Sequence, residues 1–514
     1  MKLVLLISLL FVVSALPLYA TTYISQSGGS VSCGADGTQS TTALASVSWT
    51  TSGTYKLCGT ITSQVALGAG GTSGTPLTLF FDAGSSITLP YCSVTGCLNL
   101  GGYSYVTING QNVGSVGSTN NGSASLGYAN QQDGHGIYGG GGNTNILIEH
   151  LTVGPIYVHD NSGNDILGEG TAEIYVSNDP NTSNLTIDHN VLHDSNWGIQ
   201  VNASNYTVSN NNSYNNNWTM LLGCASSTTC SNVYVFGNQA HGFNVWDTTS
   251  GNFHHNFAHS YGDSTSTVSG VYEYNNSIVG DGISSTSWVM LSEATITMNN
   301  FYAFNNLVIA STTAVAGFDL LALGSNWNVS NHTIIGAYPV GSGVQGACIK
   351  AGTGPITGFI AENNIVSNCG GSQMNFVPPL PVSPVVDYNV YTQVNPGASY
   401  PWGYNGIGAN TFAAWQTVNG GTCPSGGGFD CHGSYTASAS AVLNNTTGVI
   451  VGGGPANGTG VNLYSTCNGQ AVPGLGALCS DANGVARPAS GAWDIGAYQY
   501  QGAIGIPTAP GSLL

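Results

Sequence analysis

Positive charge is nearly absent from this chain. Its 514 residues include four lysines and arginines against 22 aspartates and glutamates, and only 5% of them are charged. Nucleic acids and anionic membranes are bound by cationic side chains that displace counterions, so both classes of partner are excluded. Disorder is excluded as well, because it requires low hydrophobicity and 41% of the residues are hydrophobic. An acidic habitat is one hypothesis for this composition, because a lysine-rich surface would repel itself once carboxylates are neutralised.

Long apolar runs are also lacking after the first 20 residues, so no later segment can span a bilayer. Residues 1–20 combine Lys2, an apolar run over 3–15 and the small residue Ala20, which is the pattern of a secretory signal peptide. The sequence therefore predicts a secreted protein, extracellular or periplasmic, with no transmembrane span.

Cysteine is present in an even number, 12, and the cysteines fall into neighbouring couples. In an exported chain this favours disulfides over metal thiolates. The sequence alone leaves the connectivity open, and we expect each couple to form one disulfide. The couples are Cys33/Cys58, Cys92/Cys97, Cys224/Cys230, Cys348/Cys369, Cys423/Cys431 and Cys467/Cys479. Cys348 and Cys369 are about one repeat apart, so their disulfide would link adjacent coils.

The chain contains a repeated unit, which is a short segment of alternating apolar residues that ends in Asn. Copies end near Asn190, Asn212, Asn238, Asn256 and Asn276, with fainter copies near Asn306, Asn331 and Asn364. Alternation indicates strands, and a regular period indicates one unit stacked many times. An Asn at each bend tolerates unusual backbone angles and can hydrogen-bond the Asn of the next coil. We therefore predict an inward column that contains Asn190, Asn212, Asn238 and Asn256.

These units predict a solenoid of short parallel strands with a cap at each end. Residues 21–100, which include the strand-like run 77–81, are expected to form the N-terminal cap. The coils should occupy 101–376, which at roughly 22 residues per coil makes about a dozen coils. Residues 377–500 should form C-terminal coils and a Gly- and Cys-rich cap, and 501–514 should form a flexible tail.

The chain as a whole resembles a right-handed parallel β-helix of the pectin-lyase-like superfamily. Its segment Asp494-Ile495-Gly496-Ala497-Tyr498 is similar to the closing motif of many bacterial members. The likeness covers about residues 100–498 and implies an all-β, right-handed parallel β-helix (β-solenoid). It does not imply a reaction, because this superfamily hosts lyases, hydrolases, esterases, epimerases and adhesins.

Residues 184–256 are similar to pectate lyase family 1 in particular. The segment 184–189 resembles its W-I-D-H strand, and 207–211 followed by 220–223 resembles its V-T-I-S-N-N and M-L-x-G segments. In this alignment the family's functional residues are replaced: its Lys falls on Trp218, its His on Asn216, its calcium-binding Asp on Gln200, and its Arg pair near Val245 and Asp247. β-Elimination from a uronate needs a base and cations that stabilise enolate-like charge. The likeness therefore favours a shared scaffold over a shared reaction.

Polygalacturonases of the same superfamily offer a second comparison. Gly134-His135-Gly136 is similar to their G-H-G motif, but it precedes any acidic pair. Only Ile349-Lys350 remains of their Arg-Ile-Lys motif, so the order of the motifs departs from that family.

Acidic and histidine side chains recur on successive repeats. The pattern Asn-x-x-His places His193, His241 and His259 outward if the Asn points inward, because side chains alternate across a strand. The same parity exposes Glu173.

Hydrolysis of a glycosidic bond needs two carboxyl groups about 5 to 9.5 Å apart, one of them protonated. Coils stacked at roughly 4.8 Å provide that spacing. The predicted catalytic residues are Asp160, Glu173, Asp194, Asp247, His193 and His241.

Aromatic and amide side chains accompany these acids. The CH groups of a sugar stack on aromatic rings while its hydroxyl groups bond amides, so this mixture suits a neutral sugar chain. The predicted substrate-binding residues are Tyr175, Trp197, Gln200, Trp218, Asn244, Trp246 and His259.

The leading hypothesis is a secreted, monomeric polysaccharide-binding protein that hydrolyses its ligand by acid/base catalysis, with no cofactor required. Calcium bound by the same acids is the competing role for them, so metal ligands stay unassigned. A first alternative is a pectate-lyase-like lyase that uses Lys350 or a metal. A second is a non-enzymatic structural or adhesive surface protein, because Asn202 and Asn205 lie in Asn-x-Ser/Thr sequons.

Overall fold

The structure is a computed structural model, and it describes residues 20–119, 134–156, 171–177, 179, 181–224, 227–243, 256–261, 265–280, 287–291, 296–310, 316–320, 322–336, 347–352, 354–395, 398–424 and 426–502. The expected signal peptide, apart from Ala20, lies outside the described residues, as does the expected tail from residue 503 onward.

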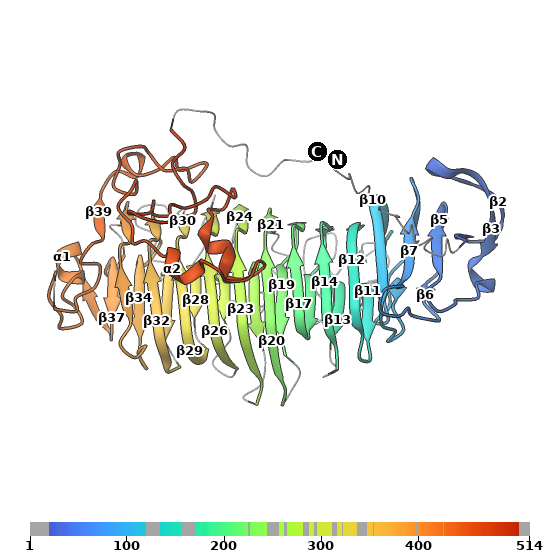
Figure 1. Ribbon diagram of the computed structural model, residues 1–514, viewed down its shortest axis with the longest axis horizontal. Coiled ribbons are helices and arrows are strands. Elements are labelled where there is room, and N and C mark those ends of the chain that lie inside the picture. Colours follow the sequence, from blue (N-terminus) through green and yellow to red (C-terminus); the bar gives the residue numbers. More distant parts are fainter. Residues whose placement is uncertain are drawn as a thin grey trace, which may run out of the picture.

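Strands stack in parallel along the molecule (Figure 1). Among the described residues, one continuous sheet of 26 strands forms two faces, which we call sheet 1 and sheet 2, and a separate sheet of 13 strands is sheet 3. The chain visits sheet 1, sheet 2 and sheet 3 in turn, and each strand pairs in parallel with the strand of the next coil. For example, Ile187 lies opposite Val208, and Val208 lies opposite Val235. The predicted all-β parallel β-helix is thereby confirmed.

Sheet 1 consists of β1 (Thr22–Ser25), β4 (Thr54–Leu57), β7 (Leu77–Phe81), β10 (Val106–Ser118), β12 (Thr144–Val153), β14 (Ser183–Asp188), β17 (Ser204–Ser209), β20 (Thr229–Phe236), β23 (Thr267–Tyr274), β26 (Thr297–Phe304), β29 (Leu323–Ser330), β32 (Ile356–Glu362) and β35 (Val385–Asp387). The ends of β10 and β12 continue into sheet 2. Sheet 2 also contains β5 (Thr60–Ile61), β8 (Ser86–Leu89), β15 (Val191–His193), β18 (Asn212–Tyr214), β21 (Gln239–His241), β24 (Ser277–Gly280), β27 (Leu307–Ala310), β30 (Thr333–Ile335), β33 (Ile365–Ser367), β36 (Val390–Thr392) and β39 (Ser434–Thr436).

Sheet 3 consists of β6 (Val65–Ala66), β9 (Leu98–Asn99), β11 (His135–Gly140), β13 (Ala172–Ser177), β16 (Trp197–Asn202), β19 (Trp218–Gly223), β22 (Ala258–Tyr261), β25 (Ser287–Leu291), β28 (Ala316–Leu320), β31 (Ile349–Gly352), β34 (Met374–Val377), β37 (Trp402–Tyr404) and the antiparallel β38 (Ile407–Ala409). The remaining elements are β2 (Gly29–Cys33), η1 (Gly34–Asp36), β3 (Gly37–Ala43), η2 (Leu44–Ser46), α1 (Phe412–Trp415), η4 (Ala439–Ala441), α2 (Tyr464–Cys467) and η5 (Leu475–Cys479).

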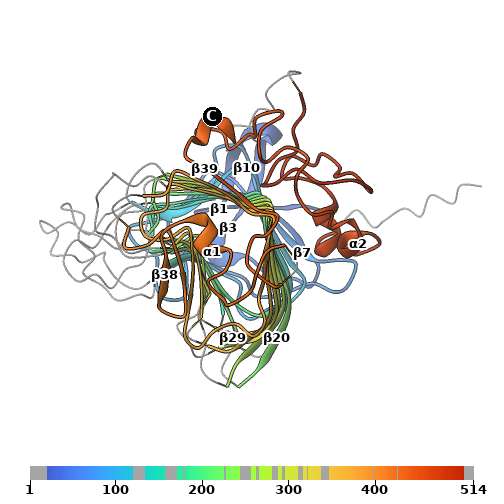
Figure 2. The same cartoon turned by 90° about the vertical axis from the view of Figure 1, so that its left-hand side faces the viewer.

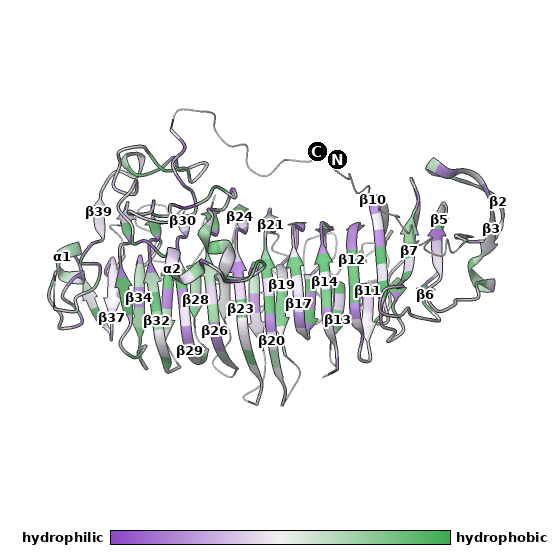
Figure 3. Ribbon diagram, viewed as in Figure 1, coloured by the Kyte–Doolittle hydropathy of each residue, from purple (hydrophilic) through white to green (hydrophobic). Residues whose placement is uncertain are grey.

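The core fills the interior of the coil. Along β14, Leu185 and Ile187 are buried while Thr186 between them is only partly buried, as alternation on a strand requires. The same alternation appears as successive hydrophobic and hydrophilic bands along the strands (Figure 3). One continuous cluster of buried apolar side chains runs from Ile24 to Phe429. Each coil therefore buries its apolar face only against its neighbours, as in other repeat proteins.

A ladder of buried amides follows the bend between sheet 1 and sheet 2. Its members are Asn190, Asn211, Asn238, Asn276, Asn306, His332, Asn364 and Asn389, and it ends on Asp430. Most Asn side chains donate to the Oδ1 atom of the next Asn; the bond from Asn211 to Asn238, for example, is 3.0 Å long. The predicted inward column therefore exists.

Two of the four predicted members of this column are wrong. Each ladder residue directly follows a residue with positive φ, such as His189 at 52° or Asn210 at 53°. In the run 210–212, Asn210 takes this bend conformation, so Asn211 rather than Asn212 enters the ladder. Asn256 is buried, but it precedes β22 of sheet 3, where its carbonyl oxygen accepts from the Thr219 N–H.

Coil stacking begins earlier than residue 101. β1 pairs in parallel with β4, β4 with β7 and β7 with β10, so much of the expected N-terminal cap is already coil. Its short, threonine-containing strands lack the Asn signature by which the later repeats are recognised in the sequence. The hairpin of β2 and β3 covers this end. At the other end α1 lies across the coil (Figure 2), with Trp415 fully buried.

The C-terminal residues from about 440 to 500 pack on the outside of the coil rather than extending it. Leu463, Leu478 and Trp493 cluster with Tyr274 and Phe304 at the ends of sheet 1 strands. A second cluster joins Ile335, Ile365 and Val390 of sheet 2 to Val442, Leu443, Ile450 and Ile495. This segment therefore covers sheets 1 and 2 along the second half of the coil.

All six predicted disulfides are present, and no cysteine is free. The Cα atoms of Cys348 and Cys369 are 5.6 Å apart, so this disulfide links successive coils as predicted. Six disulfides are typical of a protein from an oxidising compartment. Among the residues that the structure describes, no helix has the length and apolarity needed to cross a membrane.

Candidate functional site

The described candidate residues gather where sheet 2 turns into sheet 3. His193 ends β15 and Trp197 begins β16, and one coil later Tyr214 ends β18 and Trp218 begins β19. The turns 194–196 and 215–217 lie between these strands, and we call them together the Asp194 corner. Parallel pairing stacks the two turns directly on each other.

An aromatic column borders the corner on the side of sheet 2. His193, Tyr214 and His241 are in register on consecutive strands. The rings of His193 and Tyr214 stack with centroids 5.0 Å apart, and those of Tyr214 and His241 stack at 5.4 Å. His241 is exposed and its Nε2 lies 3.0 Å from Oδ1 of Asn212, while partial burial lowers its pKa. The predicted outward orientation of both histidines is confirmed.

Asp194 occupies the corner itself. Its Oδ2 atom lies 2.7 Å from Nδ1 of His193, and 23% of its side chain is exposed. Nδ2 of Asn215, in the next coil, donates to its Oδ1. Asp194 and Asn215 both have positive φ, at 62° and 57°, which Asp and Asn tolerate better than most residues. The carboxylate is therefore fixed by a neighbour on each side while it remains accessible to solvent.

Glu173 is not on the outside, and its predicted exposure is wrong. The side chain is fully buried, and its Oε2 atom accepts a hydrogen bond of 3.2 Å from Nδ2 of Asn216. Burial raises the pKa of Glu173 well above its ordinary value, and the charge of Asp194 raises it further, although hydrogen bonds from the Asn216 side chain and the His193 backbone oppose both effects.

The chain turns at the start of β13, and this explains the burial of Glu173. Strand parity predicts that Ile174 and Val176 point inward and Glu173 outward, yet Glu173 lies at the start of β13, which still belongs to the corner. Gly136 of β11 occupies the position equivalent to Glu173. A Cβ atom placed on Gly136 would contact the core side chains of Val153 and Ile156. Side chains in this row therefore point into the coil, beneath the Asp194 corner.

Sheet 3 carries a second set of aromatic residues on its outer face. Tyr138, Tyr175, Gln200, Leu221 and His259 occupy equivalent positions on consecutive strands. The rings of Tyr138 and Tyr175 stack with centroids 5.6 Å apart. The first residues of these strands form another row, which contains His135, Trp197 and Trp218. The ring of His135 stacks on that of Tyr175 with centroids 4.3 Å apart.

Five predicted substrate-binding residues are thus brought onto one face. They are Tyr175, Trp197, Gln200, Trp218 and His259. Tyr175 and Gln200 are half-buried, whereas Trp197, Trp218 and His259 are only 2%, 5% and 4% exposed. The two tryptophans pack edge to face and cluster with Leu221, so in this structure they are covered. The remaining predicted site residues, Asp160, Asn244, Trp246 and Asp247, lie outside the described residues and stay predictions.

Sequence reasoning missed several polar partners at the corner. Oδ1 of Asn216 accepts from the Ser195 N–H at 2.7 Å, and Asn217 donates to Asn196 at 3.0 Å. Asn216 and Asn217 belong to the run Asn215-Asn216-Asn217. This run is equivalent to the turn 194–196 one repeat earlier, and that equivalence is the sequence signal that could have identified them. A second acid–histidine pair, Asp188 and His189 at 2.6 Å, was visible only as an Asp-His dipeptide.

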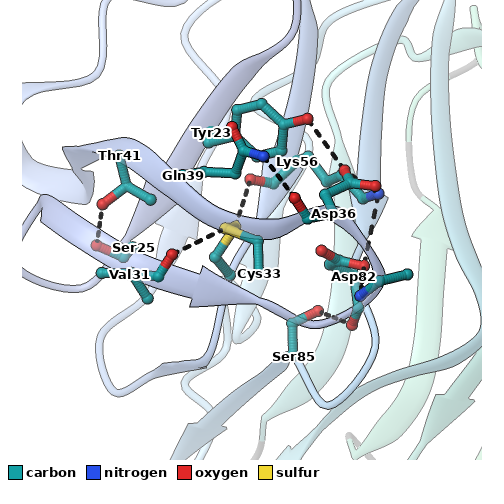
Figure 4. Close-up of a disulfide and its surroundings, with 12 residues drawn as sticks. Tyr23, Ser25, Val31, Cys33, Asp36, Gln39, Thr41, Lys56, Asp82 and Ser85 are labelled. Carbon is teal, nitrogen blue, oxygen red and sulfur yellow. Dashed lines mark hydrogen bonds and ion pairs between the residues drawn. A yellow bond between two sulfur atoms is a disulfide. The ribbon is translucent and has the colours of Figure 1, made fainter.

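Among the described residues, the acids of the Asp194 corner do not form a group of three close metal-ligating side chains. The only group of three close His, Cys, Asp or Glu side chains in the described part of the chain is Cys33, Cys58 and Asp82. The two cysteines form a disulfide, so their sulfur atoms are not thiolate ligands. Lys56 also reaches Asp82 at 3.5 Å and Asp36 at 2.6 Å, which leaves an ion-pair network rather than a cation site (Figure 4).

Several solved structures are similar to this chain, and two of them are as follows. One is described as the crystal structure of pectate lyase Pel9A, with a TM-score of 0.34, 11% identity and coverage of 93% of this chain and 96% of that chain. The other is the GH136 lacto-N-biosidase from Eubacterium ramulus, with a TM-score of 0.27, 10% identity and coverage of 75% and 67%. No protein-family model and no curated protein matches the sequence. The fold assignment therefore rests on the strand pairing of the chain itself.

Proposed function

We propose that this protein binds a polysaccharide across the outer face of sheet 3 and hydrolyses it at the Asp194 corner. One observation carries the proposal: the partly exposed pair of Asp194 and His193 lies where the ring column of His193, Tyr214 and His241 on sheet 2 meets the outer face of sheet 3, on which Tyr138 and Tyr175 stack. The sheet 2 rings follow the coil axis at the spacing of the strands, roughly 4.8 Å, and the sheet 3 row continues with Gln200 and Leu221. Such a strip suits a long chain of sugar units, whose CH faces stack on rings.

Asp194 is the proposed catalytic carboxylate. Its oxygen atoms are oriented by His193 and Asn215, so it can accept a proton from water or attack the sugar from a fixed position. His193 shares that proton through its Nδ1 atom. Its ring is held in turn by the stack on Tyr214.

Glu173 is proposed as a positioning residue. It is fully buried, so it cannot touch a substrate in this arrangement. Burial favours its neutral form, which removes the cost of an isolated charge inside the coil. Through Asn216 it holds the turn that contains Ser195, directly after Asp194. The acid that protonates the leaving oxygen is then expected from Asp160 or Asp247.

Elimination assisted by Lys or Arg is less well supported. Lys350 lies on β31, five strands along sheet 3 from β16, which is roughly 24 Å at the usual strand spacing. Arg487 is buried and donates to Asn305, Gln499 and two carbonyl oxygens. Lys56 pairs with Asp36 at the N-terminal end. With Lys2, these residues are all the cations of the chain.

A product assay tests the proposed reaction. The purified protein would be incubated with neutral polysaccharides (xylan, mannan, β-glucan) and with polygalacturonate, and products followed by mass and ultraviolet absorbance. Hydrolysis gives saturated products that have gained water, whereas elimination gives unsaturated products that absorb. Saturated products that disappear in Asp194→Asn support the proposal. Unsaturated products support the lyase, and retention on a polysaccharide without any product supports a binding or adhesive protein.

A further inference from the structure

A cavity of about 450 Å³ lies in the C-terminal segment, on the side of sheets 1 and 2 and away from the Asp194 corner. Its volume falls within the usual range of small-molecule sites, roughly 300 to 1,000 Å³. Figure 1 shows this segment in red and orange above β30 and β24. The lining residues are Ser440, Leu443, Asn444, Thr447, Val449, Ile450, Val451, Asn483, Tyr498, Gln499, Tyr500, Gln501 and Gly502.

The floor of the cavity is anchored on the β-helix. Leu443 and Ile450 are buried and belong to the cluster that contains Ile335 of sheet 2, while Tyr498 packs with Leu307. The rim differs from the floor. Tyr500 is 39% exposed and Val451 is 38% exposed, so the rim presents apolar surface to solvent. A fixed floor and an accessible aromatic rim are features of a preformed binding site.

Polar groups of the lining are available to a ligand. Tyr498 is 8% exposed, and its hydroxyl group makes no hydrogen bond to another described residue, although a buried Tyr hydroxyl usually finds a partner. Oδ1 of Asn444 accepts from two backbone N–H groups, which leaves its NH₂ group free to donate. Among described residues the Asn483 side chain also has no partner. The cavity therefore combines hydroxyl and amide groups with aromatic surface.

No lining residue carries a charge. The charged residues that contact the lining are Arg487, Asp481 and Asp494. Arg487 and Asp494 bind the Gln499 side chain through hydrogen bonds of 3.0 Å, and Asp481 accepts from the backbone N–H groups of Asn483 and Gln499. Arg487 is buried, and Asp494 accepts additional bonds from Asn457 and from the Tyr500 N–H. Neither leaves a cation at the surface of the cavity. An anionic ligand would therefore lose its hydration without gaining a counter-charge.

We propose that this cavity is an accessory site for a neutral sugar unit. The sugar ring would stack on Tyr500 and its hydroxyl groups would bond Tyr498, Asn444 and Asn483, in the same way that neutral sugars combine CH stacking with amide contacts. The site is separate from the Asp194 corner, so it would hold a polysaccharide without taking part in its cleavage. The inference does not depend on hydrolysis, because the ligand class follows from the cavity lining.

Calorimetric titration of the Asp194→Asn protein tests this site without consuming the ligand. Cellohexaose, xylohexaose and mannohexaose serve as neutral probes, and trigalacturonic acid serves as the charged one. At least one neutral probe should bind, and Tyr500→Ala should weaken that binding at least about tenfold, the effect of a lost ring stack. Tyr498→Phe keeps the ring and removes only the hydroxyl, so it should weaken binding less. Asn483→Ala is an exposed change that leaves folding intact and should also weaken binding.

The outcomes separate this site from the proposed reaction. The inference would be overturned if the Asp194→Asn protein bound the neutral probe equally well with and without the Tyr500→Ala or Asn483→Ala substitution. It would also be overturned if only trigalacturonic acid bound, or if no probe bound. Thermal melting shows whether Tyr500→Ala is folded, and Asn483→Ala decides the question if it is not. Absence of hydrolysis by the native protein, together with Tyr500-dependent binding, would mean that the catalytic proposal alone has failed.

Discussion

Asn216 connects Glu173 to the turn that carries Asp194. Its Nδ2 donates to Oε2 of Glu173 at 3.2 Å, while its Oδ1 accepts from the Ser195 N–H at 2.7 Å. A second donor bond from Asn216 goes to Ser213 at 3.1 Å. The buried acid therefore supports the conformation of the corner from the inside of the coil, and its chemistry can be separated from that of the exposed carboxylate.

Glu173→Gln should retain most of the activity. The amide keeps an oxygen for Asn216 and has nearly the same shape, and burial already keeps the native carboxyl neutral. Glu173→Ala should lower the free energy of unfolding by roughly 1 to 3 kcal/mol, because it leaves the Asn216 amide without this acceptor. Turnover, its pH profile and urea unfolding would be measured for both variants. A loss of at least about a hundredfold in folded Glu173→Gln would identify Glu173 as a general acid instead.

Asp194→Asn should reduce turnover by at least about a hundredfold, the lower end of a general acid/base contribution. The amide preserves the size of the side chain, so the coil should remain folded. Asp188→Asn is the matched control, because Asp188 also contacts the adjacent histidine, His189, but lies at the end of β14, away from the corner. Steady-state kinetics compare the two. If both variants were equally active, Asp194 would have no catalytic role.

The amide ladder predicts a stability difference between two neighbouring asparagines. Asn211→Ala removes bonds to Asn190 and Asn238 and should cost roughly 1 to 3 kcal/mol for each buried group left unpaired. Among the described residues, the Asn212 side chain hydrogen-bonds only the exposed His241, so Asn212→Ala should change stability by less than about 0.5 kcal/mol. The midpoints of urea unfolding measure both effects. A larger loss in Asn212→Ala would contradict the ladder.

The burial of Glu273 predicts that the free energy of unfolding falls as the pH rises. It lies inside the coil, neither of its carboxyl oxygens has a hydrogen-bond partner, and burial raises its pKa to about 8. The adjoining cavity of about 10 Å³ is lined by Tyr206, Leu222, Val233, Ser260, Val268, Val271 and Met298, and none of these is charged.

The folded chain keeps this proton where the unfolded chain releases it, between the ordinary pKa of Glu and about pH 8. The free energy of unfolding should therefore be highest below about pH 4.3 and should decrease towards pH 8, by up to roughly 1.4 kcal/mol per pH unit from this group. Glu273→Gln should lack that component, and urea unfolding of both proteins at several pH values shows the difference. If the free energy of unfolding of both proteins had the same pH dependence, the predicted contribution of Glu273 would be refuted. Such a group agrees with the hypothesis of an acidic habitat.

The sequence predicts the features that depend on local repetition. Alternation within each unit identifies the strands, and short spacing identifies the disulfide partners, such as Cys348 and Cys369. Register within a run of identical residues is not encoded locally, so Asn211 and Asn212 could be distinguished only by the backbone angle of Asn210. His332 fills an Asn position in the ladder by accepting through Nδ1, which no pattern of asparagines indicates.

The candidate site was harder to predict because it lies at a corner. Strand parity holds in the middle of β13, where Ile174 is buried and Tyr175 is half-buried, but it fails at Glu173, where the chain is still turning. Burial of Trp197 and Trp218 depends on how their side chains pack between successive coils, where they cluster with Ala172 and Leu221. The type of residue at the site was thus predictable, whereas its exposure required the three-dimensional structure.

The most direct test of the account is a crystal structure of Asp194→Asn with an oligosaccharide from a polysaccharide that the native protein binds. The sugar chain should lie over the outer face of sheet 3 and cross the Asp194 corner. One glycosidic oxygen should lie within hydrogen-bonding reach of residue 194 or of its bound water, about 2.6 to 3.2 Å. A ligand bound only to sheets 1 and 2 or in the C-terminal cavity, with the corner empty, would contradict the account.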